Sequence, residues 1–417
     1  METEIERLRS EVTELRKQLS APPQTLTAQA VTTAALAQPA AADAPAAATS
    51  ATQAPPPDLA AIMGPLNITG FVDGFFNYDF NHPNAAVPSV PAGNFAATTK
   101  IPRVSGFRAF EGPDRQFALN LAEFIVNKSP AAESPLGFNL AFGFGNAMNV
   151  VNSTDPGTLA FSQYLKEGYL SYLAPVGKGL QVDFGKFVTP FGAEVIESKD
   201  NWNYSRGILF TYAIPFYHFG ARAKYVFNDK ASLTGYIVNG WNNIIENNTG
   251  KSYGLSVALN PAKKISIVQN YMTGPEQPEN NSRWRQLSDT VVTWNATSKL
   301  SFMTNFDYGR DHPVGSSTGY WTGIAGYLRY ALNDKVALAT RYEYYNDHAG
   351  FTTLQPQHIQ SATGTLERKI AGRLISRLEY RWDGSNRDAF MKGSRPVDTQ
   401  QTVLGGVVYT FDFKELK

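Results

Sequence analysis

Apolar and polar residues alternate along most of the chain from about residue 66 to the end. In residues 300–308, Phe302 and Phe306 fall on one face of an extended chain, and Asp307 falls on the other. A repeat of two residues is the pattern of a β-strand with one apolar face. The pattern predicts strands here and, in the same way, at 138–144, 253–259 and 403–413.

The predicted strands are long, and their connections are sorted by length. Strands of about 10–14 residues exceed the usual five or six of soluble sheets and suit a tilted crossing of a bilayer. Tight turns such as Asn-Asp-Lys at 228–230 and 333–335 alternate with long polar segments, and Asn and Asp suit tight hairpins. Short turns on one rim and long loops on the other indicate an all-β transmembrane antiparallel barrel of about 16 strands over residues 63–417, the last strand pairing with the first.

Composition agrees with this fold and excludes several others. A soluble β-sandwich also alternates, but it has no reason to sort its connections by length. The chain has 26 Phe and 20 Tyr, yet it contains no apolar run of 18 residues, which excludes a helical membrane protein. A net charge of +1 gives no bulk attraction to nucleic acid, and the absence of Cys excludes disulfides and thiolate sites.

We predict that the barrel carries an outer apolar belt that includes Phe142, Leu255, Phe306, Val407 and Phe411.

Two different segments precede the predicted barrel. Residues 1–19 repeat apolar positions at spacings of three and four, which indicates either a lone solvated helix or a short coiled coil. Residues 20–62 are almost wholly Ala, Pro, Thr, Gln and Ser, a composition typical of a disordered linker. The first residues lack the apolar stretch of a secretory signal, so we expect that a signal was removed or that translation begins upstream. The predicted coiled-coil core is Ile5, Leu8, Val12, Leu15 and Leu19.

Three stretches of the barrel region resemble a known family. They are GFVDGFFNYDFN at 70–81, FGKFVTPFGAEV at 184–195 and PFYHFGARAKYVFNDKASLTGYIVNGW at 215–241. They are similar to the OmpL-like β-barrel porins of the outer membrane of Gram-negative bacteria. The resemblance implies passive diffusion of small hydrophilic solutes through a barrel surrounded by outer-membrane lipid. The heptad and linker resemble the periplasmic extensions of some trimeric porins, which implies a homo-oligomer, most simply a trimer, with the N-terminal segment in the periplasm.

Charged residues recur on the face of the strands that we expect to point inward. They either hydrate the channel and pair across strands, or they create a transverse field that favours ionic solutes. We expect a weak anion preference that increases at low salt, and we expect substitution of Arg377 and Arg381 by Gln to leave folding intact. The predicted basic pore-lining residues are Arg222, Lys224, Arg329, Arg341, Arg373, Arg377 and Arg381. The predicted acidic ones are Asp73, Asp79, Asp183, Asp307, Glu343 and Glu379, with Asp289 and Asp412 on the same faces.

The loop at residues 192–215 differs from the other long loops because it mixes charges with many apolar side chains. An exposed loop has no use for so many apolar groups. If the loop folds into the barrel, its apolar half would pack on the wall and its charges would face the channel. The alternative is a loop that packs on top of the barrel or against another subunit. The charges of the predicted constriction loop are Glu194, Glu197, Lys199, Asp200 and Arg206.

We find no motif for catalysis, a cofactor or a metal. The chain lacks a phosphate-binding Gly-rich loop, His-Glu-x-x-His and Gly-x-Ser-x-Gly. A metal site from His312, His348 and His358 has no supporting spacing. One alternative function is a sugar- or oligosaccharide-selective channel, with Phe71, Phe75, Tyr169 and Tyr327 as inward aromatic residues. The other alternative is an adhesin or envelope anchor with a closed barrel.

Overall fold

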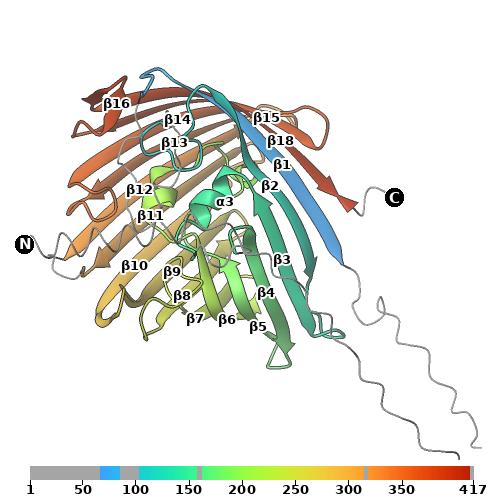
Figure 1. Cartoon of the computed structure of the whole chain (residues 1–417). Coiled ribbons are helices and arrows are strands. Elements are labelled where there is room, and N and C mark those ends of the chain that lie inside the picture. Colours follow the sequence, from blue (N-terminus) through green and yellow to red (C-terminus); the bar gives the residue numbers. More distant parts are fainter. Residues whose placement is uncertain (1–65, 85–102, 157–161, 314–317, 414–417) are drawn as a thin grey trace, which may run out of the picture. The chain divides into compact units, whose positions relative to one another are not determined.

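The computed structural model describes residues 66–84, 103–156, 162–313 and 318–413. Within them, sixteen antiparallel strands form one closed barrel, in which β1 pairs with β18 (Figure 1). This confirms the predicted closure and strand number. The strands are β1 (Asn67–Asp79), β2 (Gln116–Lys128), β3 (Leu136–Phe144), β4 (Leu165–Ala174), β5 (Leu180–Val188), β6 (Tyr217–Asn228), β7 (Ala231–Val238), β8 (Ser252–Ala262), β9 (Ile265–Gln277), β10 (Asn280–Trp294), β11 (Leu300–Asp311), β12 (Gly319–Ala331), β13 (Val336–Asp347), β14 (Gln357–Lys369), β15 (Leu374–Ser385) and β18 (Thr399–Asp412).

The alternation in the sequence corresponds to the outer and inner faces of the barrel. Along β11, Phe306 is exposed, whereas its neighbours Asn305 and Asp307 are buried. Phe142, Leu255 and Val407 are exposed in the same way on their own strands. Because exposed apolar side chains alternate with buried polar ones, the outer wall is the apolar one, as lipid requires.

Strand lengths vary more than the sequence predicts. They range from 8 residues in β7 to 15 residues in β10. The strand β10 is long because its hairpin with β9 continues to the pair Asn280–Gln277. The strand β3 is short because Gly145 has a φ of 126°, a left-handed conformation that ends the strand and leads into a helix. Both ends of the barrel chain lie on the rim that carries the short turns, as an even strand number requires.

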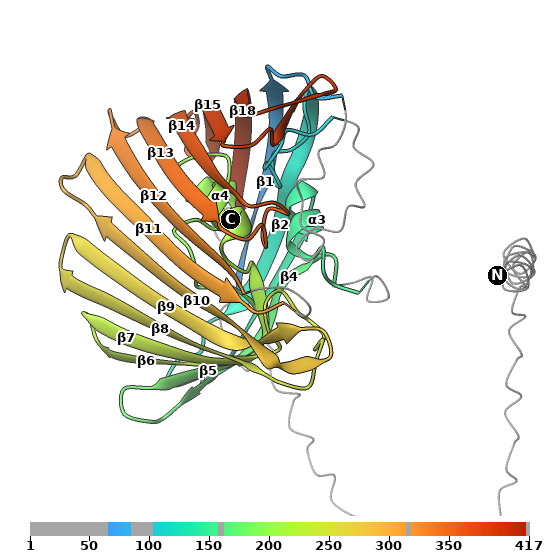
Figure 2. The same cartoon turned by 90° about the vertical axis from the view of Figure 1, so that its left-hand side faces the viewer.

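Several long loops form short elements of their own. They are α3 (Asn146–Val151), the 3-10 helix η1 (Ser198–Asp200), α4 (Ile208–Tyr212), and the hairpin of β16 (Phe390–Lys392) with β17 (Arg395–Val397). Figure 2 shows α4 within the circle of strands, where it contacts β12 and β13. Among the described residues, every helix is too short or too polar to cross a membrane.

The loops bring an apolar core into the barrel. Phe107 and Phe110 of the first long loop, Met148 of α3, and Phe191 and Phe210 of the third long loop are all buried in one cluster. The sequence predicts an interior lined by hydrated polar residues, so this core differs from the expectation. The physical reason is that three loops pack against one another there and exclude water from their apolar side chains. The predicted coiled coil and linker, residues 1–62, lie outside the described residues.

Candidate functional site

The loop between β5 and β6, residues 189–216 (the constriction loop from here on), lies inside the barrel. Its first part binds one wall: the Gly192 N–H donates to the Asp289 carboxylate at 2.6 Å, and the Ala193 N–H donates to Asn305 at 3.1 Å. Its middle part binds a different part of the wall, where the hydroxyl groups of Ser198 and Tyr204 donate to Asp73 at 2.6 and 2.5 Å. Because β10 and β11 lie far from β1 in the strand order, the loop spans the interior.

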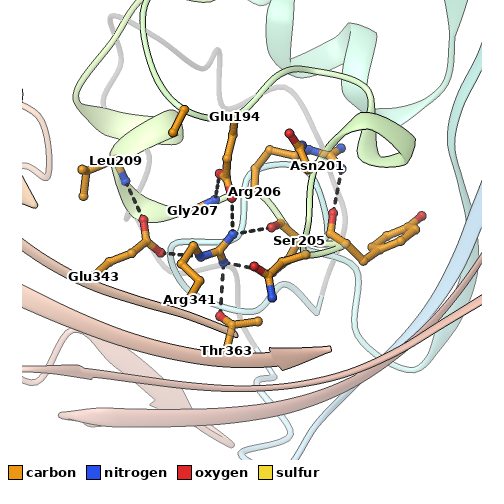
Figure 3. A network of polar contacts seen from close by, with 12 residues as sticks. Glu194, Asn201, Ser205, Arg206, Gly207, Leu209, Arg341, Glu343 and Thr363 are labelled. Atoms are coloured by element: carbon orange, nitrogen blue, oxygen red, sulfur yellow. Dashed lines mark hydrogen bonds and ion pairs between the residues drawn. The ribbon is translucent and has the colours of Figure 1, made fainter. Parts of the chain in front are cut away.

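Arg341 of β13 joins the constriction loop to the wall (Figure 3). Its guanidinium lies 2.5 Å from Glu194 of the loop and 2.9 Å from Glu343 of its own strand. It also donates to the Ser205 carbonyl at 2.6 Å. Burial raises the pKa of Glu194, although the positive charge of Arg341 acts to lower it. The side chain of Arg341 is 0% exposed, so its charge is used to hold the loop and does not face water.

Arg377 and Arg381 of β15 hold the next part of the loop. Arg377 donates to the carbonyl oxygens of Ser198 and, at 2.8 Å, of Asn201, and it pairs with Glu367 at 2.6 Å. Arg381 donates to the Arg206 carbonyl at 2.8 Å. Bonds from a charged donor to a carbonyl are stronger than neutral ones, so these two side chains fix the loop backbone.

Carboxylates of the same wall accept the N–H groups of the loop. Glu379 accepts from the Tyr204 N–H at 2.7 Å, and Glu343 accepts from the Leu209 N–H at 3.1 Å. A Cβ atom at Gly207 would lie 2.2 Å from a Glu343 oxygen, so a larger residue here would displace this carboxylate. The alternating charges of β13 and β15 therefore form a cradle that satisfies both the donors and the acceptors of a buried loop backbone.

Lys166 of β4 holds the loop from the opposite side. It forms ion pairs with Glu197 of the loop and, at 2.5 Å, with Glu123 of β2. Burial acts to raise the pKa of Glu197, but the charge of Lys166 outweighs burial and lowers it. Sequence reasoning missed Lys166, because an isolated Lys near a strand end carries no signal of its partners.

Residues 103–115 of the first long loop also fold inward and pack on the constriction loop. Arg108 pairs with Asp383 of β15 at 2.9 Å, and Glu111 pairs with Arg206 at 3.0 Å. The ring of Phe110 lies 5.8 Å from that of Phe210. Sequence reasoning also missed this segment, although the mixture of aromatic and charged residues at 107–115 meets the criterion that singled out 192–215.

The structure corrects the expected exposure of many interior charges. They point inward, but the loops cover them, because the loops' buried backbone groups and opposite charges need partners. Arg377 and Arg381 have buried partners in the loop, which the expected tolerance of their substitution by Gln did not include. The expectation that Glu194 and Arg206 of the loop face the channel is wrong. The covered residues are Asp73, Asp79, Asp307, Asp289, Arg341, Glu343, Arg377, Glu379 and Arg381.

A smaller set of predicted interior charges remains partly open. Lys224 is exposed, and the Arg222 side chain is 22% exposed although it pairs with the buried Asp183 at 2.8 Å. Arg329 is 30% exposed and pairs with Glu367 at 3.0 Å. On the constriction loop, Lys199 and Asp200 pair at 2.5 Å and stay partly in water. Arg373 is half-buried in the turn before β15, and Asp412 is half-buried at the end of β18.

The inward aromatic residues are mostly covered as well. Phe71, Phe75 and Tyr327 are 1, 3 and 5% exposed. Tyr169 is half-buried, and the Arg222 guanidinium lies 4.9 Å from the centre of its ring. These four residues therefore do not form a row of exposed rings on which a sugar could stack.

The histidines considered as metal ligands lie apart in other contacts. His348 stacks on Tyr320 at 4.1 Å, His358 stacks on Tyr344 at 5.7 Å, and His312 bonds to Thr318. Within the part of the chain that the structure describes, no three His, Asp or Glu side chains are grouped to hold a metal ion.

Comparison with known proteins agrees with this geometry. The profile of the family described as "Putative beta-barrel porin-2, OmpL-like" matches residues 65–411. The fold is similar to the anion-selective porin from Comamonas acidovorans (9% identity, TM-score 0.54, 83% of this chain and 99% of that one). It is also similar to the outer membrane channel DcaP of Acinetobacter baumannii (11%, 0.53, 83% and 97%) and to the trimer form of OmpT of Vibrio cholerae (12%, 0.53, 83% and 99%). No curated protein sequence matched the chain.

Proposed function

The chain belongs to the OmpL-like beta-barrel porin-2 family and is a non-enzymatic outer-membrane porin, and from this premise we propose that it passes small hydrophilic solutes through a passage narrowed by the constriction loop. The observation that carries the proposal is the attachment of that loop to both sides of the interior, through Arg341 and Arg377 on one side and Lys166 on the other. A loop held at so many points narrows the barrel permanently and restricts passage to small solutes.

The partly open charges support a weak preference for anions. Asp183 offsets Arg222, and Asp200 offsets Lys199, whereas Lys224 has no ion-pair partner among the described residues. Arg329 shares Glu367 with Arg377, which leaves one positive charge in excess. The net field is small and basic, and physiological salt screens it over about 8 Å.

Single-channel recording in planar bilayers tests this function. The wild-type protein should form a stable conductance and give a reversal potential that leans toward anions in a potassium chloride gradient. Lys224→Gln should shift the potential toward cations, and Arg310→Gln should not, because Arg310 lies on the outer face of β11. If the wild type and Lys224→Gln had the same reversal potential, Lys224 would not line the conducting path.

We also propose a homotrimer whose N-terminal segments associate. The trimer form of the V. cholerae protein supports this assembly only as a similarity of fold. Linked barrels would raise the local concentration of residues 1–19, which are too short to associate strongly alone. Deletion of residues 1–60 should leave the barrel folded and make the oligomer dissociate at a lower temperature in native electrophoresis. Unchanged oligomer stability would refute a role for this segment.

One alternative is favoured by the apolar core inside the barrel. A barrel closed by its loops would act as an envelope anchor and would not conduct. Absence of any conductance from correctly folded protein would support this alternative and overturn diffusion as the function.

A further inference from the structure

Three oxygen-bearing side chains form a row on the inner wall where the constriction loop begins. Asn270 of β9 pairs directly with Asp289 of β10, and Asp289 pairs directly with Asp307 of β11. Side chains opposite each other in such a ladder have their Cβ atoms about 4.5–5.5 Å apart. All three side chains are 0% exposed, so two carboxylates lie side by side without access to bulk water.

Opposite charges do not compensate these carboxylates. Among the described residues, no basic side chain forms an ion pair with Asp289 or Asp307. Arg341, which lies two strands from Asp307 on β13, is paired with Glu194 and Glu343. Two buried carboxylates without a positive partner are strongly unfavourable.

Three oxygens in the row accept no well-formed hydrogen bond from the described residues, although the Asn305 amide lies close to Asp307. They are both carboxylate oxygens of Asp307 and the amide oxygen of Asn270. The Asn270 amide is oriented by its NH2 group, which donates to the Pro190 carbonyl at 3.0 Å and to Asp289 at 3.4 Å. All three unsatisfied atoms are acceptors. A single shared proton would satisfy at most two of them, whereas one cation would be a partner for all three.

We propose that Asp289, Asp307 and Asn270 bind one calcium ion at the root of the constriction loop. Two carboxylates match the charge of a divalent cation, and calcium accepts irregular shells of carboxylate and amide oxygens completed by water. Magnesium fits less well, since it requires a nearly ideal octahedron. The site would stabilise the loop, because the Oδ1 atom of Asp289 accepts the Gly192 N–H. Asp289 would therefore join the ion to the backbone of the constriction loop. The proposal is independent of which solute the channel passes.

Calcium titration of purified protein in detergent, after removal of metals with EDTA, tests the site. Calorimetry should detect one calcium per chain, calcium should raise the temperature of unfolding, and magnesium should have a smaller effect. Asp307→Asn should weaken calcium binding at least tenfold. Asp200→Asn, which removes an exposed carboxylate of the constriction loop, should leave calcium binding unchanged. Equal binding by Asp307→Asn and the wild type would overturn the site.

Hydrogen exchange of the wild-type protein provides a test that needs no variant. Calcium should slow exchange of the Gly192 and Ala193 amides and leave the rim turn at 333–335 unchanged. If the carboxylates share a proton instead, calcium will have no effect and acidification alone will stabilise the protein. That result, or calcium protection spread evenly over the barrel, would overturn the proposal.

Discussion

Replacement of Arg377 by Gln should loosen the constriction loop without unfolding the barrel. The guanidinium of Arg377 donates to the loop carbonyls of Ser198 and Asn201 and pairs with Glu367. Glu367 keeps Arg329 as a partner at 3.0 Å, so the substitution leaves no carboxylate entirely unpaired. The loss is therefore concentrated on the attachment of the loop.

The magnitude follows from the bonds that are lost. Two hydrogen bonds from a charged donor contribute about 1.5–3 kcal/mol each, and the Gln amide restores one neutral bond of about 1 kcal/mol. The loop attachment should weaken by about 2–5 kcal/mol. Because about 1.4 kcal/mol is a factor of ten in an equilibrium constant, the population of the detached loop should rise by about thirty-fold to a few thousand-fold.

Hydrogen exchange with mass spectrometry measures this population directly. Exchange of peptides within residues 192–212 should accelerate by at least ten-fold in Arg377→Gln, because protected amides exchange through local opening. Arg222→Gln is the matched control, since it removes the same charge from an inner-wall residue that pairs with Asp183. Single-channel currents of Arg377→Gln should also become noisier. Equal exchange rates in both variants and the wild type would refute the role assigned to Arg377.

Three further predictions concern the belt and the other attachments. Phe306→Arg should lower the free energy of unfolding in lipid vesicles by roughly 2–4 kcal/mol, measured by denaturant titration, because it places a charge in the outer apolar belt; an unchanged value would place Phe306 off the lipid face. Tyr204→Phe should cost about 1–3 kcal/mol in the same titration, since Asp73 loses a buried donor at 2.5 Å; a neutral result would mean that water replaces the hydroxyl. Lys166→Met should cost about 3–5 kcal/mol by leaving buried carboxylates unpaired, and addition of Glu123→Gln should recover part of that loss; a purely additive double variant would argue against the pair.

The strands, their closure and their outer belt could be predicted from the sequence. A strand exposes alternate residues to opposite faces, so Phe142 and Phe306 had to share the outer face once lipid was inferred. Short and long connections are also local features that can be read along the chain. The inward direction of Arg341 and Arg377 follows from the same period of two. The apolar content of residues 192–215 indicated that this loop packs either inside the barrel or on top of it, and the structure places it inside.

Only the tertiary structure decided which inward residues face water. Arg377 bonds to loop residues that precede it by more than 170 positions, and the position of a charge within its own strand carries no trace of that contact. The row of Asn270, Asp289 and Asp307 is formed by three strands, and its lack of a positive partner depends on where every other cation is placed. Exposure, pairing and the width of the passage arise from contacts between distant segments, whereas periodicity is a property of each segment alone.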